Sequence, residues 1–152
     1  MVSAHEKTAQ GEIDWESTLR KCGLALSEKP VPEGTTAPMT ALLHATGGNV
    51  RPTITTEKSK AGLSSLDEHW RDLFRHIAPQ GDEFLIILWG PGSASKGWFR
   101  VRDLEFAHTG LPSRVQAAIG RPEFYCISLG NTYFGAVTIE EDEYWIVSRD
   151  LS

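Results

Sequence analysis

An uninterrupted run of apolar residues at positions 84–89, Phe-Leu-Ile-Ile-Leu-Trp, constrains the fold more than any other feature of this chain. The run has the length of a strand and is too short for a typical helix. Successive side chains of a strand point to opposite faces of a sheet, so an apolar residue at every position is typical of a strand buried on both faces. The run therefore predicts a central strand.

More strands are predicted in the second half of the chain. Apolar side chains alternate over residues 97–106, with one change of phase, which predicts a strand with a bend or bulge. Residues 124–129, 132–139 and 144–147 predict a meander of three strands. Its first turn is expected at residues 130–131, Gly-Asn, a pair that favours two-residue hairpins.

The N-terminal part predicts helices instead. Apolar residues recur at helical spacing over residues 15–26, and Arg20 and Lys21 near Gly23 would suit a helix end. Residues 38–46 begin with a proline, which suits the first turn of a helix, and stop before two glycines, which suit the end of one. The apolar pattern of this second helix consists of Met39, Leu42 and Leu43.

Two further helices have clear boundaries. Ser65 and Glu68 have the spacing of a capping box, and a single apolar stripe follows them until Pro79, which predicts a helix over residues 65–78. A short helix is predicted over residues 112–119, where a glycine follows the last apolar position.

The predicted order is therefore three helices followed by ββαβββ. This order predicts an α+β fold in which N-terminal helices precede a largely antiparallel five-stranded sheet, with the helix over 112–119 crossing between two hairpin groups. A length of 152 residues fits a single domain over residues 1–152. The polar segments 27–38 and 51–62 are expected to be loops.

Charge and cysteine content argue against several classes of protein. A net charge of −5 and a pI near 5.5 disfavour direct binding to nucleic acid, which requires clustered Lys and Arg. Residues 1–10 lack the apolar core of a signal peptide, and no apolar run is long enough to span a membrane. Cys22 and Cys126 lie far apart in a chain large enough to fold without a disulfide, so we expect reduced thiols and a cytoplasmic protein.

A segment rich in glycine and serine, residues 90–97, follows the apolar run. Its backbone amides and polar side chains could surround an anion, although it lacks the spacing of a phosphate-binding P-loop. The residues of this possible ligand loop are Gly90, Gly92, Ser93, Ser95 and Lys96. The alternative is a connection between strands in which glycine, proline and serine serve only as turn residues.

Other candidate groups have structural explanations. His69, Asp72 and His76 share one flank of a predicted helix, but the two histidines are two turns apart, which favours a solvated face over a metal site. Cys126 and His108 have the residue types of a nucleophile and its base, yet strand alternation places Cys126 in the core. We therefore assign no catalytic residue, and we predict no metal and no cofactor.

Four consecutive acidic residues, Glu140, Glu141, Asp142 and Glu143, join two predicted apolar strands. They can be a solvated hairpin tip that prevents the sheet from associating edge to edge. They can also be an electrostatic docking patch for a basic protein, strengthened by nearby aromatic side chains. The aromatic residues predicted to join this patch are Tyr133, Tyr144 and Trp145.

Two functional hypotheses follow. The first is a non-enzymatic protein-binding module, an acidic inhibitor or immunity-type protein that blocks a basic partner, because the strand-rich part is acidic and the sequence holds no catalytic motif. The second is a small-ligand enzyme or sensor with a pocket between sheet and helices, using the 90–97 segment and His108. The sequence predicts no oligomeric state.

Overall fold

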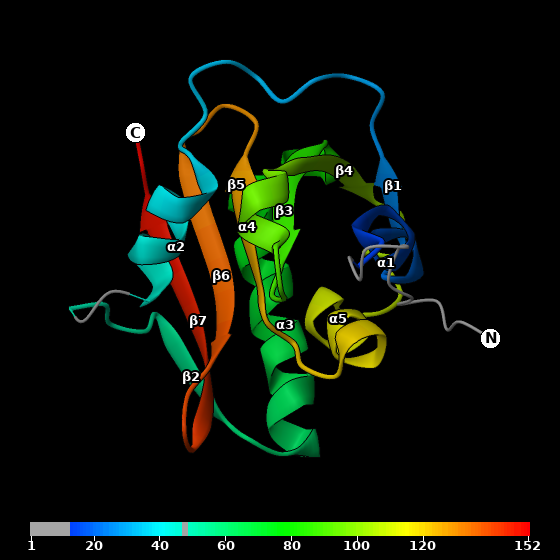
Figure 1. The fold of residues 1–152 in the computed structure, drawn as a ribbon. Helices are drawn as coiled ribbons and strands as arrows, with labels where there is room; N and C mark the ends of the chain where they lie inside the picture. The colour runs from blue at the N-terminus through cyan, green and yellow to red at the C-terminus, as the bar shows by residue number, and fades with distance from the viewer. Residues whose placement is uncertain (1–12, 47–48) are drawn as a thin grey trace.

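The computed structural model describes residues 13–46 and 49–152, which form an α+β fold (Figure 1). Seven strands make one sheet in the order β1-β4-β3-β5-β6-β7-β2, and every neighbouring pair is antiparallel. The elements are α1 (Trp15–Lys21), β1 (Leu24–Leu26), α2 (Pro38–Thr46), β2 (Ile54–Glu57), α3 (Lys60–Ile77), the 3₁₀ turn η1 (Pro79–Gly81), β3 (Phe84–Leu88), α4 (Ser93–Lys96), β4 (Phe99–Asp103), α5 (Leu111–Ile119), β5 (Phe124–Ser128), β6 (Tyr133–Ile139) and β7 (Glu143–Asp150).

The predicted α+β class and the antiparallel sheet are confirmed, but the five-stranded sheet and the element order are wrong. The five predicted strands are β3 to β7, and two short strands from the N-terminal part, β1 and β2, add the two edges that make seven. Helix α4 also separates β3 from β4, so the C-terminal part reads βαβαβββ and not ββαβββ.

Strand β1 lies in the last part of the apolar pattern over residues 15–26. Helix α1 stops at Lys21, where the basic residues before Gly23 suit a helix end, and Gly23 adopts a φ of 80°, the left-handed conformation that commonly follows one. The chain then turns back and pairs Leu24 with Asp103 of β4. The strand was not predicted, because it depends on pairing with β4.

Strand β2 lies within residues 51–62, which were expected to be a loop. It pairs Ile54 with Ile146 of β7, and its polar residues alternate between half-buried and exposed positions. A four-residue edge strand of this composition is determined by its neighbour in the sheet more than by its own sequence. Residues 27–37, by contrast, contain no helix or strand.

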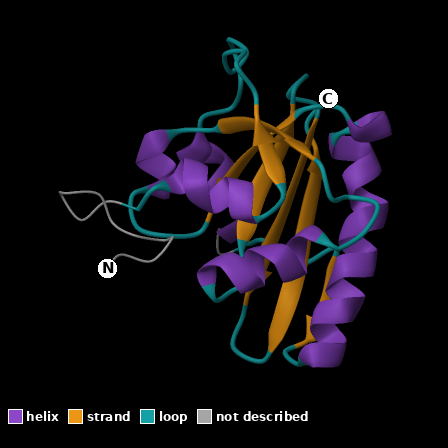
Figure 2. Cartoon of the chain, turned by 90° about the vertical axis from the view of Figure 1, so that its right-hand side faces the viewer, coloured by secondary structure: helices purple, strands orange, loops and turns teal. Residues whose placement is uncertain are grey.

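The sheet is covered on both faces (Figures 1 and 2). Helices α1, α3 and α5 cover one face, here called the α3 face, and the long helix α3 runs along it. Helix α2, with the short α4 beside it, covers the other face, here called the α2 face. Strand β3 is buried at all five positions and sends alternate side chains into each layer, which confirms the predicted central strand.

Helix α3 begins five residues earlier than predicted, because Ser59 and not Ser65 is its N-cap and accepts a hydrogen bond from the amide of Gly62 at 3.0 Å. The predicted apolar stripe of this helix is buried: Leu66, Trp70, Leu73, Phe74 and Ile77. Helix α5 crosses from β4 to β5 over β3, as predicted. Among the described residues, no helix combines the length and the apolar character needed to cross a membrane.

Candidate functional site

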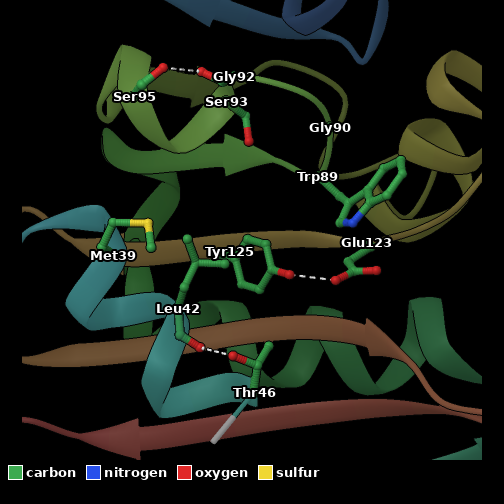
Figure 3. Close-up of a pocket in the computed structure, with 10 residues that line it drawn as sticks. All are labelled: Met39, Leu42, Thr46, Trp89, Gly90, Gly92, Ser93, Ser95, Glu123 and Tyr125. Atoms are coloured by element: carbon green, nitrogen blue, oxygen red, sulfur yellow. Dashed lines mark hydrogen bonds between the residues drawn. The ribbon is translucent and has the colours of Figure 1, made fainter.

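A cavity of about 550 Å³ opens on the α2 face, between α2, the 90–97 segment and the start of β5 (Figure 3). Its apolar walls are supplied mainly by Met39, Leu42 and Trp89, and Glu123 and Tyr125 lie at its inner end. The remaining lining residues are Thr46, Gly90, Gly92, Ser93 and Ser95.

The 90–97 segment forms one wall of this cavity because glycine lets the chain turn sharply after β3. A Cβ atom at Gly90 would lie 2.4 Å from the Trp15 ring, and the φ of Gly90 is 154°, so another residue would be strained there. The segment is not a simple strand connection, because residues Ser93–Lys96 form helix α4. Four of the five predicted ligand residues line the cavity, whereas Lys96 is at the exposed end of α4.

Ser93 differs from the other hydroxyl groups of the cavity. The hydroxyls of Thr46, Ser95 and Tyr125 each donate a hydrogen bond to a protein oxygen. Ser93 is nine-tenths buried, at 9% exposure, and its hydroxyl points toward the ring of Tyr125 without a hydrogen-bond partner among the described residues (Figure 3). The Ser93 hydroxyl is therefore open to a partner that enters the cavity, whereas, among the residues described in this region, the buried side-chain atom without a partner is Nε of Arg121.

The inner end of the cavity holds a network of Arg121, Glu123 and Tyr125. One carboxylate oxygen of Glu123 accepts from the Arg121 guanidinium and the other accepts from the Tyr125 hydroxyl. Glu123 is only 5% exposed, and its charge is balanced by Arg121, whose guanidinium carbon lies 4.0 Å from the centre of the Trp89 ring. Burial, and then the hydrogen bond to Glu123, raises the pKa of Tyr125 far above its ordinary value, so its hydroxyl remains a donor.

The acidic turn closes the β6–β7 hairpin through a hydrogen bond of 2.9 Å from the Glu140 amide to the Glu143 carbonyl. Two of its carboxylates have local partners: Glu140 accepts from Thr138, and Glu143 accepts from the Trp145 indole at 2.7 Å. Glu141 and Asp142 are exposed. The turn and Glu123 lie at the same end of the sheet, because β5 starts where β6 ends.

The three predicted aromatic partners of this turn do not form one cluster. Trp145 packs on the α2 face, and Tyr144 packs on the α3 face. Tyr133 lies at the opposite end of β6, where its ring stacks on His76 with 5.0 Å between ring centres. The structure therefore groups the acidic turn with Trp145 and Tyr144, and it places Tyr133 at the far end of the hairpin.

The cysteine and histidine candidates are also separated. Cys126 is fully buried in β5, whereas His108 is exposed in the turn region after β4. Burial raises the pKa of the Cys126 thiol well above its ordinary value and that of Cys22 to about 12, so both thiols stay protonated. His69 and His76 belong to no cluster of three or more metal-ligating side chains within the described part of the chain.

A second cavity, of about 520 Å³, lies on the other side of Trp89 and is bounded by α1 and the end of α5. It is lined mainly by apolar groups. The hydroxyl of Thr18, which lines it, donates to the Asp14 carbonyl at 2.9 Å. This cavity therefore offers few polar groups that could orient a ligand, and we place the candidate site in the first cavity.

Helix α2 exposes two of its large apolar side chains, which the sequence pattern did not predict. Ala41 and Ala45 face the sheet and are buried, while Met39 and Leu43 are 63% and 65% exposed. The pattern of Met39, Leu42 and Leu43 predicted this helix correctly but not which side chains it buries. Glu123 and Tyr125 could have been paired from strand alternation, since residues two apart in an extended chain share a face.

Comparison with protein-family models, with curated proteins and with solved structures finds no match for this chain. The function is therefore argued from the geometry and chemistry of the cavity, the outer face of α2 and the acidic turn.

Proposed function

We propose that this protein is a non-enzymatic protein-binding module whose docking surface combines the outer side of α2, the rim of the cavity and the acidic turn. The observation that carries the proposal is the orientation of α2. A helix on a sheet normally buries its large apolar side chains and exposes small or polar ones. Helix α2 buries two alanines and exposes Met39 and Leu43.

Three of the four large apolar residues that are exposed in the described part of the chain lie near one place on the surface, and the fourth, Leu104, lies beside β1. Met39 and Trp89, the latter 41% exposed, line the cavity, and Leu43 follows Met39 by one helical turn. Burying a side chain of this size against a partner is worth about 1.5–3 kcal/mol. Three such residues around a cavity supply the apolar centre that protein interfaces require.

The acidic turn adds an electrostatic preference to this surface. Glu141 and Asp142 are exposed at the end of the sheet where the cavity has Glu123, and the whole chain carries a net charge of −5. Such a field accelerates encounter with a basic protein and disfavours acidic ones. These properties support an acidic inhibitor, including an immunity-type protein, that covers a basic surface on its target.

The proposal is tested by affinity capture from the native host with three forms of the full chain: wild type, the double variant Met39→Ser with Leu43→Ser, and Leu104→Ser. Leu104 is a matched control because it is 61% exposed and lines a different hollow, beside β1. We expect a basic protein to be captured by wild type and by Leu104→Ser and lost with the double variant. Equal capture by all three forms would contradict docking on α2.

A second candidate, a small-ligand sensor, is supported by the unpartnered Ser93 hydroxyl in a cavity of ligand size. Its test is thermal stabilisation of the protein by a library of metabolites, followed by the same measurement on Ser93→Leu. A compound that stabilises wild type and not Ser93→Leu would favour this candidate over protein docking.

A further inference from the structure

We propose that the cavity on the α2 face is an anchor pocket for one basic side chain, a lysine or an arginine, of the partner. This inference rests on the proposed protein-binding function and adds the chemistry of the residue that enters the cavity. It is carried by three observations: an apolar entrance, an inner end lined by hydrogen-bond acceptors, and a backbone wall in which the amides of Ser93 and Lys96 are already bonded.

The entrance suits the methylene stem of a long basic side chain. Met39 and Leu42 from α2 face Trp89 across the opening (Figure 3). Lysine and arginine bury their stems along apolar surface while the charged end reaches a polar region. The aromatic face of Trp89 is already covered on one side by Arg121, so the stem would contact the remaining edge and face.

The residues that line the inner end of the cavity offer acceptors more than donors, because Arg121, whose Nε is a buried donor without a partner among the described residues, is not among them. The Ser93 hydroxyl is free to accept, and the Tyr125 oxygen has accepting capacity left because its proton is given to Glu123. Glu123 itself accepts one hydrogen bond on each carboxylate oxygen, and an ionised carboxylate can accept about four in total. An ammonium or guanidinium group brings donors only, which matches the Ser93 and Tyr125 hydroxyl oxygens and the two carboxylate oxygens of Glu123.

The charged groups around the cavity determine which sign of charge on a bound side chain is favoured. Glu123 and Arg121 balance each other, and the acidic turn at the same end of the sheet adds four acidic side chains, against one ammonium group from Lys58, which donates to the Glu141 carbonyl at 3.2 Å. Glu140 of that turn accepts from Thr138, and its charge adds to the shift that keeps Tyr125 protonated. The cavity therefore lies in a negative field, which favours a cation.

The same geometry argues against an anion in the 90–97 segment. The Ser93 amide donates to the Gly90 carbonyl at 3.2 Å, and the Lys96 amide donates to the Gly92 carbonyl at 3.3 Å. These amides close the turn of α4 and are not directed to a ligand. A buried carboxylate opposite them would also repel an anion.

The test is an NMR titration of the isotope-labelled full chain with four blocked amino acids: N-acetyl-arginine methylamide, the lysine and norleucine equivalents, and the glutamate equivalent. We expect arginine or lysine to shift the amide signals of Ser93 and Tyr125 saturably, with about millimolar affinity, as single side chains bind weakly. Norleucine has the stem of lysine without its charge and should bind at least about fivefold more weakly.

Two serine variants locate the binding. Ser93→Leu should fill the cavity and abolish the shifts at Tyr125, while shifts in the exposed acidic turn remain. Ser93→Ala, which is expected to fold in any case, should weaken binding by about threefold to tenfold through the lost hydroxyl. Ser95→Ala is the matched control, because the Ser95 hydroxyl bonds to the Gly92 carbonyl within α4, and it should bind like wild type.

The outcomes separate this inference from the proposed function. Equal binding of norleucine and lysine would overturn the basic anchor and leave an apolar docking surface on α2. Saturable binding of glutamate would overturn it in favour of an anion site. Arginine shifts confined to the acidic turn would also overturn it, because the cavity would then be unused. None of these results changes the capture expected from the Met39 and Leu43 variants.

Discussion

The two faces of the sheet are covered in different ways. On the α3 face, an 18-residue helix packs Trp70 and Phe74 against the sheet. The rings of Trp70 and Phe124 contact edge to face, with 4.7 Å between their centres. On the α2 face, a nine-residue helix directs alanines inward and leaves Met39 and Leu43 in solvent. The first face is closely packed beneath α3, although a cavity lies between α1 and α5, whereas the second face leaves large apolar side chains of its helix in solvent.

The buried charges show the same difference. Arg114 on the α3 face holds both carboxylate oxygens of Asp103 at 2.8 and 2.7 Å and also donates to the Cys22 carbonyl, so it ties α5 to β4 and α1. On the α2 face, Glu123, which pairs with Arg121, lines the inner end of the cavity. The Arg114–Asp103 pair joins elements of the fold, whereas Glu123 of the other pair presents polar atoms to the cavity.

The largest difference between the faces should appear on truncation of aromatic and long apolar side chains. Phe74→Ala removes a ring that is 2% exposed and contacts Phe84 and Phe106, so we expect a loss of about 3–5 kcal/mol of unfolding free energy. Met39→Ala should change it by no more than about 0.5 kcal/mol. Urea unfolding measures both, and a comparable loss for Met39→Ala would show that α2 is packed like α3.

The second difference concerns the ion pairs. Arg114→Met leaves the Asp103 carboxylate buried without its partner, so we expect the unfolding free energy to fall by about 3 kcal/mol. Arg121→Met should cost about 1–2 kcal/mol, because Glu123 keeps the Tyr125 hydroxyl and the cavity admits water. Unfolding of the two variants in urea tests this expectation. A loss of unfolding free energy for Arg121→Met as large as that for Arg114→Met would show that the cavity network stabilises the fold as much as the Arg114–Asp103 pair does.

Helix α3 was predictable from a local signal, because its apolar stripe repeats with helical spacing, whereas strand β1 was not. The β5–β6 connection was also predictable, because it uses Asn131 at a φ of 57°, as a tight turn with a Gly-Asn pair favours. On the α2 face, the sequence indicated Ser93 and Gly90 through composition alone. The roles of Glu123 and of α2 depend on which strand lies beneath which helix, and no local pattern contains that information.

A third and smaller difference should appear at alkaline pH. The pKa of Tyr125 is raised by burial and by its bond to Glu123, so ionisation of this residue is easier in the unfolded chain than in the folded one. Its contribution to stability is complete below about pH 10 and is lost progressively above it, by about 1.4 kcal/mol per pH unit. Unfolding of wild type and Tyr125→Phe between pH 8 and pH 11 should show a shallower decline for the variant, and parallel declines would contradict the buried donor.

The smallest effect on stability and the clearest on binding should come from the acidic turn. Changing Glu141→Gln and Asp142→Asn removes two exposed charges, while Glu140 and Glu143 keep their bonds to Thr138 and Trp145. The unfolding free energy should change by less than about 0.5 kcal/mol.

The association rate with a basic partner captured through α2 should fall several-fold at low salt and converge with that of wild type at high salt, because the field of these charges is screened over about 8 Å at physiological ionic strength. Dissociation should be unchanged, since both side chains are solvated at the rim. Stopped-flow mixing at two salt concentrations measures these rates. Equal association rates of wild type and variant at low salt would show that the turn is only a solvated hairpin tip and that the outer face of α2 is the whole docking surface.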